Sequence, residues 1–441
     1  MSKAVRSAAP VVQTRTAGAG SPASVRPWVA RRTREPYVQL LIAQTSAAAG
    51  ALVANLLIAR ALAPAGRGWI ALLLQVSYLA SQLLLLGTER SFVAVYSGSP
   101  AAVAARAYFR LAAGPCAAGL AAVAAIAWIA PASVRPPWTI FALVASFTIV
   151  NVFVLAIRAI AIATGQTAAY VRYTAVGQVI LLTTMGALHL GGVTSPSVWF
   201  LAYVLAGVLP TFVCWMRWWR MAGAMDAAAD PERIRAVRRE GLALVPASIA
   251  NMGMLRFDRL MLPALASTTA LGLYATVATM TQLVSWPLQA FADSRLGTWR
   301  AAHGRGWLRP SPLVVSAAVY GLIVAPTVGI AIYLLVVPLF GQPYAAGKAL
   351  VPPLIAAATL YGVSRMTLGL LIAQGRNLMA SAAEVCGFAV SIAAYILLIP
   401  SYGASGAAYG SLLGYGVCLV VTAAAVRTRG DRSRREPEPQ P

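Results

Sequence analysis

The stretch Gly241–Leu265, GLALVPASIANMGMLRFDRLMLPAL, is long and apolar enough to span a bilayer, yet it holds three charged residues within four positions. A charged side chain near the middle of a membrane costs about 2.5–3.5 kcal/mol on insertion scales. Arg256, Asp258 and Arg259 are therefore expected to face protein or a water-filled cavity rather than lipid. The sequence predicts a membrane protein that handles a charged group inside the bilayer.

Apolar segments of similar length recur along the whole chain. Hydrophobic residues form 59% of the 441 positions and charged residues only 11%. This composition predicts an all-α polytopic membrane protein with twelve transmembrane helices and excludes the soluble classes. The expected spans are 37–61, 68–87, 108–130, 138–163, 171–189, 198–218, 241–265, 270–291, 313–339, 350–373, 380–399 and 405–426.

Basic residues support this topology, because most of the 35 lysines and arginines fall in the two tails and in alternate connections. The pattern predicts a multi-pass protein of the bacterial cytoplasmic membrane with both termini in the cytoplasm. A cleaved signal is a weaker explanation of the first span, which is too long for a signal core. The expected domains are a disordered basic tail (1–36), an N-terminal six-helix bundle (37–218), a cytoplasmic linker helix (219–240), a C-terminal six-helix bundle (241–426) and a second disordered tail (427–441).

Several functions are disfavoured by the distribution of polar residues. The net charge of +23 is divided among short loops and tails, which indicates membrane topology and anionic lipid rather than nucleic acid. Four cysteines stand singly, and the two histidines add no familiar metal spacing, so no metal or cofactor is expected. The short external connections hold no acidic residue, which disfavours an enzyme.

The two halves of the chain resemble each other. Gly68-Trp69-Ile70-Ala71 opens the second span, and Gly272-Leu273-Tyr274-Ala275 opens the eighth. Six spans per half give both halves the same orientation, so they would be related by a pseudo-twofold axis along the membrane normal. The alternative is that small residues recur wherever membrane helices pack closely.

Three segments carry a resemblance to a known family. Ala59–Trp69 (ARALAPAGRGW) is similar to the first-half signature of polysaccharide flippases in the multidrug/oligosaccharidyl-lipid/polysaccharide exporter superfamily. Arg256–Leu262 with Gly272–Ala278 resembles the second-half signature, and Ala373–Arg376 is also similar. The resemblance implies an alternating-access flippase that moves an undecaprenyl-diphosphate-linked oligosaccharide to the outer leaflet. It also implies membrane lipids, a coupling proton or sodium ion and polysaccharide assembly enzymes as partners.

Arginines at membrane depth are the candidate substrate-binding residues, because a diphosphate needs cationic donors. Arg256 and Arg259 share a helix face, and Arg365 of the tenth span reaches the cavity from the same half. The alternative is that these arginines are structural. Arg60 and Arg67 flank an external turn, where they either attract phosphate or, as is favoured, extend to the membrane surface.

Acidic residues are candidates for coupling and gating. Asp258 points away from Arg259 and is expected to meet a partner on another helix, with Arg365 as the candidate. It would bind the coupling ion or form a latch, and a static ion pair is the alternative. Glu384 is a second coupling candidate, unless it only faces a loop. A cytoplasmic gate network is a further hypothesis and would consist of Glu89, Arg90, Asp293 and Arg295.

Two other functions remain open from sequence. A cation-coupled multidrug exporter of the same superfamily would have more intramembrane acids than this chain. A membrane glycosyltransferase or ligase would need a titratable group in an external loop. A flippase is the favoured function.

Overall fold

The computed structural model describes residues 36–85, 88–129, 137–223 and 230–432. All regular secondary structure within them is helical. Most of the two expected tails lies outside the described residues, although the last helix continues to Arg432.

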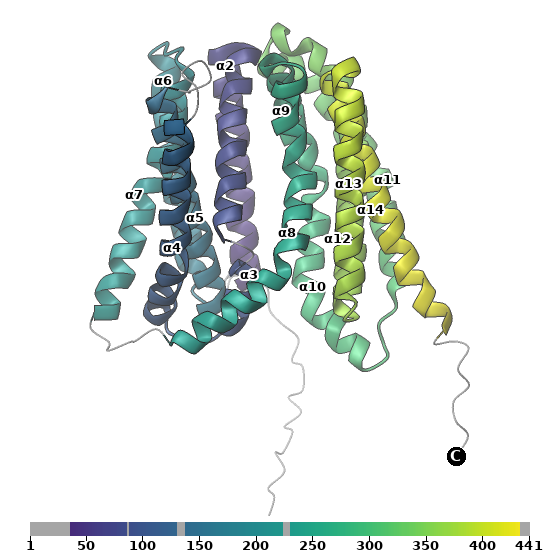
Figure 1. The fold of residues 1–441 in the computed structure, drawn as a ribbon. Helices are drawn as coiled ribbons and strands as arrows, with labels where there is room; N and C mark the ends of the chain where they lie inside the picture. The colour runs from purple at the N-terminus through teal and green to yellow at the C-terminus, as the bar shows by residue number, and fades with distance from the viewer. Residues whose placement is uncertain (1–35, 86–87, 130–136, 224–229, 433–441) are drawn as a thin grey trace, which may run out of the picture.

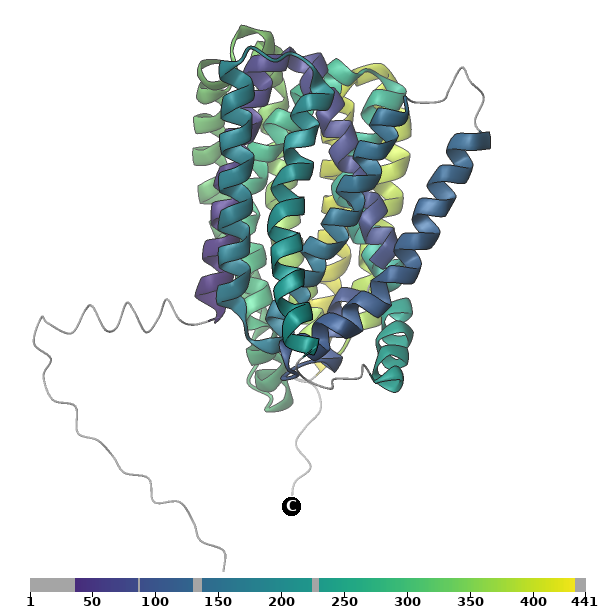
Figure 2. The same cartoon turned by 90° about the vertical axis from the view of Figure 1, so that its left-hand side faces the viewer.

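The first six expected spans form one bundle, here called the N half (Figures 1 and 2). Its longest helix, α2, bends back at Ala63, whose φ of 54° and ψ of −180° interrupt the helix just before Pro64. The two arms of α2 correspond to the first two spans. The helices of this half are α2 (Pro36–Leu85), α3 (Thr88–Val95), α4 (Ala101–Ile129), α5 (Trp138–Thr164), α6 (Thr167–Leu190) and α7 (Pro196–Gly223).

The connection between the halves is α8 (Pro231–Leu265). Asp230 caps its start by accepting the Glu232 amide at 2.9 Å, and proline at the first helical position suits that turn. The first turns of α8 pack on the N half, where Ser91 donates to the Val237 carbonyl at 3.0 Å. No break separates these turns from the seventh span, so the expected linker and the expected span belong to one helix.

The later turns of α8, which hold the seventh span, and the remaining helices form the C half. Close packing of small residues holds α13 against α14, since a Cβ added to Gly387 would lie 2.8 Å from the Gly414 carbonyl oxygen. The helices are α9 (Thr268–Thr281), η2 (Gln282–Val284), α10 (Trp286–Gly304), α11 (Pro310–Phe340), η3 (Gln342–Leu350), α12 (Val351–Ala373), α13 (Asn377–Tyr402) and α14 (Ala404–Arg432).

The expected twelve crossings are present. Eight helical segments of the described chain are long and apolar enough to cross a membrane, and the bent α2 crosses twice. The other crossings are α4, the charged α8 and the broken pair α9–α10. The eighth expected span is longer than predicted, because α10 continues to Gly304.

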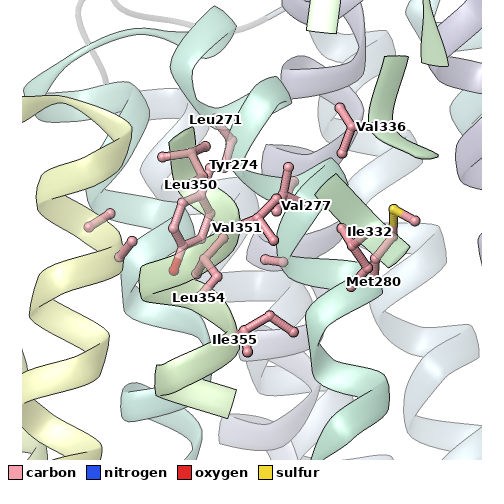
Figure 3. Close-up of a cluster of buried hydrophobic side chains, with 14 of the residues drawn as sticks. Leu271, Tyr274, Val277, Met280, Ile332, Val336, Leu350, Val351, Leu354 and Ile355 are labelled. Atoms are coloured by element: carbon pink, nitrogen blue, oxygen red, sulfur yellow. The ribbon is translucent and has the colours of Figure 1, made fainter. Parts of the chain in front are cut away.

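The two halves meet at one end and diverge at the other (Figure 1). We call the end where α2 begins and α14 ends the tail side, and the opposite end the far side. A buried apolar cluster lies toward the far side, built from α9, α11, η3 and α12 (Figure 3) and joined by Ala59 and Ala71 of α2.

Glycines bring the two halves into backbone contact on the far side. A Cβ added to Gly68 would lie 1.8 Å from the Thr268 carbonyl oxygen, and one added to Gly272 would lie 1.9 Å from the Pro64 carbonyl oxygen. Gly68 and Gly272 are the equivalent residues of the sequence repeat. Contact between equivalent residues is expected where a twofold axis passes between two halves.

Candidate substrate-binding site

Arg256 of α8 reaches from the C half into the N half. Its Nη1 donates to Gln75 Oε1 at 3.0 Å, and its guanidinium carbon lies 4.7 Å from the centre of the Tyr78 ring. Both partners belong to the second arm of α2. Arg256 therefore spans the interface between the halves through a hydrogen bond and a cation–π contact.

Arg67 is buried at the same interface, contrary to the surface position favoured from sequence. Its side chain is only 4% exposed, and Nη2 donates to Asn55 Oδ1 on the first arm of α2. Nε and Nη1 have no hydrogen-bond partner in the described part of the chain. Burial of unpaired cationic donors is costly, so Arg67 carries an energetic cost in this conformation.

Arg259 completes a group of three arginines at the interface, here called the arginine cluster: Arg67 and Arg259, which are buried, and Arg256, which is partly buried. Arg259 is 7% exposed, its Nε and Nη2 lack partners among the described residues, and it interacts electrostatically with Arg67. Arg256 lies level with Gln75, roughly 12 Å of helix below Arg67. The cluster thus forms a column that descends from the far side between the two halves.

Among the acidic side chains that the structure describes, one carboxylate lies beside the arginine cluster. Asp258, 4% exposed, accepts the Arg259 backbone amide at 2.7 Å and the Tyr274 hydroxyl of α9 at 2.6 Å. Tyr274 also contacts Ser411 of α14 at 3.3 Å. Asp258 therefore has a partner on another helix, as expected, but that partner is Tyr274 and not Arg365.

A small polar cavity borders Asp258 within the C half. Its volume is about 30 Å³, and its polar lining includes Tyr274, Gln282, Ser285 and Ser411. A cavity of this size with several polar groups can hold water or a small cation. Asp258 is one of the residues that line this cavity.

Arg365 and Glu384 pair with each other, away from the arginine cluster. Arg365 Nη1 donates to Glu384 Oε1 at 2.6 Å and to Asn251 Oδ1 at 3.1 Å. All three residues belong to the C half. The structure does not bring Arg365 to the cluster, and Glu384 is buried in an ion pair rather than facing a loop.

Solved structures of transporters share this architecture. An inward-facing multidrug resistance MATE family transporter of the MOP superfamily aligns with a TM-score of 0.66 and 14% identity, covering 92% of this chain and 100% of that one. Lipid II flippase MurJ in an inward closed conformation aligns with a TM-score of 0.62 and 12% identity, covering 88% and 87%. A MOP superfamily transporter from Pyrococcus furiosus aligns with a TM-score of 0.59 and 14% identity, covering 91% and 95%.

The chain has the fold of the MOP superfamily transporters. The expected fold class, two six-helix bundles related by a pseudo-twofold axis along the membrane normal, is confirmed. No family model matches the chain, and no curated protein matches its sequence. These structures are transporters rather than enzymes, and the described helices are those of a multi-pass membrane protein.

The other predicted site residues of this MOP-type fold lie apart from the arginine cluster. Arg60 is exposed on the far side, where its Nε donates to the Leu339 carbonyl at 2.7 Å and Nη2 to the Pro338 carbonyl at 3.2 Å. It thereby links α2 to the end of α11. Its position favours a contact that closes the far side over a direct role in binding.

The predicted gate is only partly described. Glu89 of α3 lies near Tyr108 of the N half, and Arg295 is exposed and stacks 5.7 Å from the Phe291 ring of its own helix. The side chains of Arg90 and Asp293 lie outside the described residues. The gate network therefore stays a prediction.

Three participants were missed from the sequence: Asn55, Gln75 and Tyr274. Asn55 and Gln75 are polar amides in otherwise apolar arms of α2, and each is at least 93% buried. A search for single amides within the first two spans would have found both. Tyr274 stands in the quoted repeat motif, but nothing in that motif indicated that its hydroxyl would donate to Asp258.

Removal of one partner of the Arg365–Glu384 pair should destabilise the C half. We expect Glu384→Gln to lower the free energy of unfolding by up to about 3 kcal/mol, because it removes the carboxylate charge that pairs with Arg365 in a mostly buried position. The double variant Arg365→Met/Glu384→Met should regain much of that loss. Thermal unfolding of the wild type, Arg365→Met, Glu384→Met and the double variant in detergent completes the cycle, and strictly additive effects would contradict a coupled pair.

Proposed function

We propose that this chain is an alternating-access flippase of the bacterial cytoplasmic membrane. It moves an undecaprenyl-diphosphate-linked oligosaccharide from the inner to the outer leaflet for surface polysaccharide assembly, together with the enzymes of that assembly. The observation that carries this proposal is the arginine cluster, which holds two buried cations and one partly buried cation beside a single described carboxylate.

The chemistry of the arginine cluster suits a diphosphate. Arginine keeps its charge at every physiological pH and offers several donors to phosphate oxygens. Arg67 and Arg259 both have donors without partners, and they come from opposite halves. A diphosphate between them would satisfy these donors and cancel the repulsion between the two guanidinium groups.

The proposed topology determines the side of the membrane from which the substrate reaches the arginine cluster. Basic residues concentrate on the tail side, which we assign to the cytoplasm by the positive-inside rule. With the far side closed, the arginine cluster would be approached from the cytoplasm in this conformation. The TM-score is higher to an inward-facing transporter (0.66) than to an outward-facing one (0.54), which agrees with a conformation that is open toward the cytoplasm.

Transport then requires the halves to rock so that the far side opens as the tail side closes. Diphosphate binding would compete with the Arg256–Gln75 hydrogen bond and draw Arg256 toward the substrate. The far-side contacts, which are Arg60 with the end of α11 and Gly68 with Gly272, would separate as the tail side closes. Substrate binding shifts this equilibrium only by its difference in affinity for the two states.

Flipping in proteoliposomes tests the proposed function. A fluorescent undecaprenyl-diphosphate oligosaccharide should gain access to the outer leaflet only in vesicles that contain the protein, and inorganic pyrophosphate in the cytoplasm-equivalent compartment should inhibit it. In cells, deletion of the gene should cause complete lipid-linked repeat units to accumulate on the inner leaflet. Normal export with altered drug tolerance would refute the flippase.

Asp258 is proposed to bind the coupling proton or sodium ion at the 30 Å³ cavity. We expect Asp258→Asn to abolish the acceleration that an imposed ion gradient gives to flipping in vesicles, because the neutral amide can neither bind a proton nor attract a cation strongly. Slow exchange without a gradient should persist. Glu384→Gln is the matched control and should keep the gradient response; the opposite pattern would assign coupling to Glu384.

A cation-coupled multidrug exporter is the second candidate. It is favoured by the TM-score of 0.66 to a MATE transporter and by a buried carboxylate beside a polar cavity. A cationic drug would, however, meet the repulsion of the three arginines of the cluster. Uptake of a fluorescent cationic dye into inverted vesicles, lost in Asp258→Asn, would support this candidate over the flippase.

A further inference from the structure

The outer face of the N half carries a groove between α6 and α7, the two helices that face the viewer in Figure 2. The groove has a volume of about 550 Å³ and lies on the surface that would contact lipid. It is separate from the arginine cluster, which faces the C half. Its walls are mostly apolar and include Val176, Ile180, Leu209 and Val213.

A close helix crossing explains where the groove begins. Gly177 of α6 lets α7 approach, since a Cβ added there would lie 3.3 Å from the Ala206 carbonyl oxygen and 3.9 Å from Pro210. Just beyond this crossing, Tyr173 and Thr211 join the helices through their hydroxyls at 3.0 Å. The groove extends from here toward the tail side, where Cys214, Arg217 and Met221 of α7 line it.

The tail-side part of the groove is basic. Arg172 of α6 and Arg217 of α7 both line it and are exposed, and Gln166 adds a polar group from the start of α6. None of the residues that line the groove is acidic. The groove therefore combines an apolar channel with a cationic mouth, which complements a lipid that has an anionic head group.

We propose that this groove binds one phospholipid with an anionic head group from the tail-side leaflet. Its phosphate lies between Arg172 and Arg217, and an acyl chain follows the apolar walls toward the crossing at Gly177. Basic pockets between membrane helices on the cytoplasmic side are suited to such head groups. Because α6 packs against α2, which supplies Asn55 and Arg67, occupancy of the groove stabilises the half that holds part of the arginine cluster. This inference does not depend on which substrate the protein transports.

Native mass spectrometry of the purified full-length protein tests the proposal. With equal amounts of phosphatidylglycerol and phosphatidylcholine added, the wild type should retain one phosphatidylglycerol in preference. Arg172→Gln/Arg217→Gln should weaken that binding on the order of tenfold or more, because each basic residue near an anionic lipid contributes to affinity. Val176→Trp, which fills the groove without changing charge at a residue that is 49% exposed, should also weaken it.

A control with the same loss of charge is Arg235→Gln/Arg239→Gln, two exposed arginines of α8 that do not line the groove. This control should keep the wild-type preference. Equal retention of phosphatidylcholine, or an equal loss in the control, would overturn the proposal. Displacement of phosphatidylglycerol by equimolar undecaprenyl phosphate would also overturn it, since the groove would then serve a polyprenyl lipid.

Discussion

Gly68→Ala should open the far side of this protein. The added methyl group would lie 1.8 Å from the Thr268 carbonyl oxygen, and the contact is backbone on both sides, so no side chain can move away to relieve it. Overpacking of this kind typically costs about 1–3 kcal/mol. Because this cost falls only on the closed far side, the ratio of open to closed molecules should rise roughly 5- to 150-fold. Gly272→Ala should also open the far side, since its methyl group would meet the Pro64 carbonyl oxygen.

Cysteine accessibility measures this opening. Ala275 is 1% exposed at the far-side contact, so Ala275→Cys in a chain freed of its four natural cysteines should resist a membrane-impermeant maleimide. With Gly68→Ala added, labelling from the far side should become rapid. Gly186→Ala is the matched control, because a Cβ there meets nothing within 4 Å. Unchanged protection of the introduced thiol in a folded Gly68→Ala protein would show that the glycine contact does not hold the far side closed.

Arg67→Gln should lower transport and raise thermal stability at the same time. Arg67 is buried with two donors unpaired and is repelled by Arg259, so its removal relieves a cost in the protein without ligand. We expect the unfolding temperature to rise by a few degrees. A hydrogen bond from a charged donor contributes about 1.5–3 kcal/mol, so transport of a diphosphate lipid should fall roughly 10- to 100-fold.

Ligand-dependent unfolding separates a binding role from a structural one. Inorganic pyrophosphate should raise the unfolding temperature of the wild type in detergent, because a ligand that binds the folded state stabilises it. It should have little effect on Arg67→Gln or Arg259→Gln. Arg300→Gln, an exposed tail-side residue, is the control and should respond as the wild type does. A stabilising effect of pyrophosphate that survives in both cluster variants would remove the arginine cluster from substrate binding.

The fold was predictable because membrane insertion depends on properties that are local in sequence. Length and apolarity identify spans such as those within α5 and α11, and the bias of basic residues tests their number. The charged segment of α8 was predicted as a span because it is otherwise long and apolar enough to cross a bilayer. The burial of Arg259 and Asp258 followed from the same reasoning, since lipid would exclude them.

Partners of the charged residues were predictable only in part. A face shared by Arg256 and Arg259 follows from helix geometry, and Arg256 does turn toward the N half. The pairing of Asp258 with Arg365 was wrong, because Arg365 meets Glu384 and Asn251 within the C half. Which neighbouring helix supplies a partner depends on the rotation of each helix in its bundle, and no local pattern specifies that rotation.

The sequence by itself determined that the chain is a twelve-span membrane protein with a repeated half and charges placed at membrane depth. Tertiary structure alone decided that Arg67 joins those charges, that Gly68 touches its repeat partner across the interface, and that Asp258 is paired with Tyr274. The physical reason is that transfer into a membrane depends on the composition of each segment. Burial of a side chain near a turn, and contact between two glycines far apart in the chain, arise only when the two halves pack together.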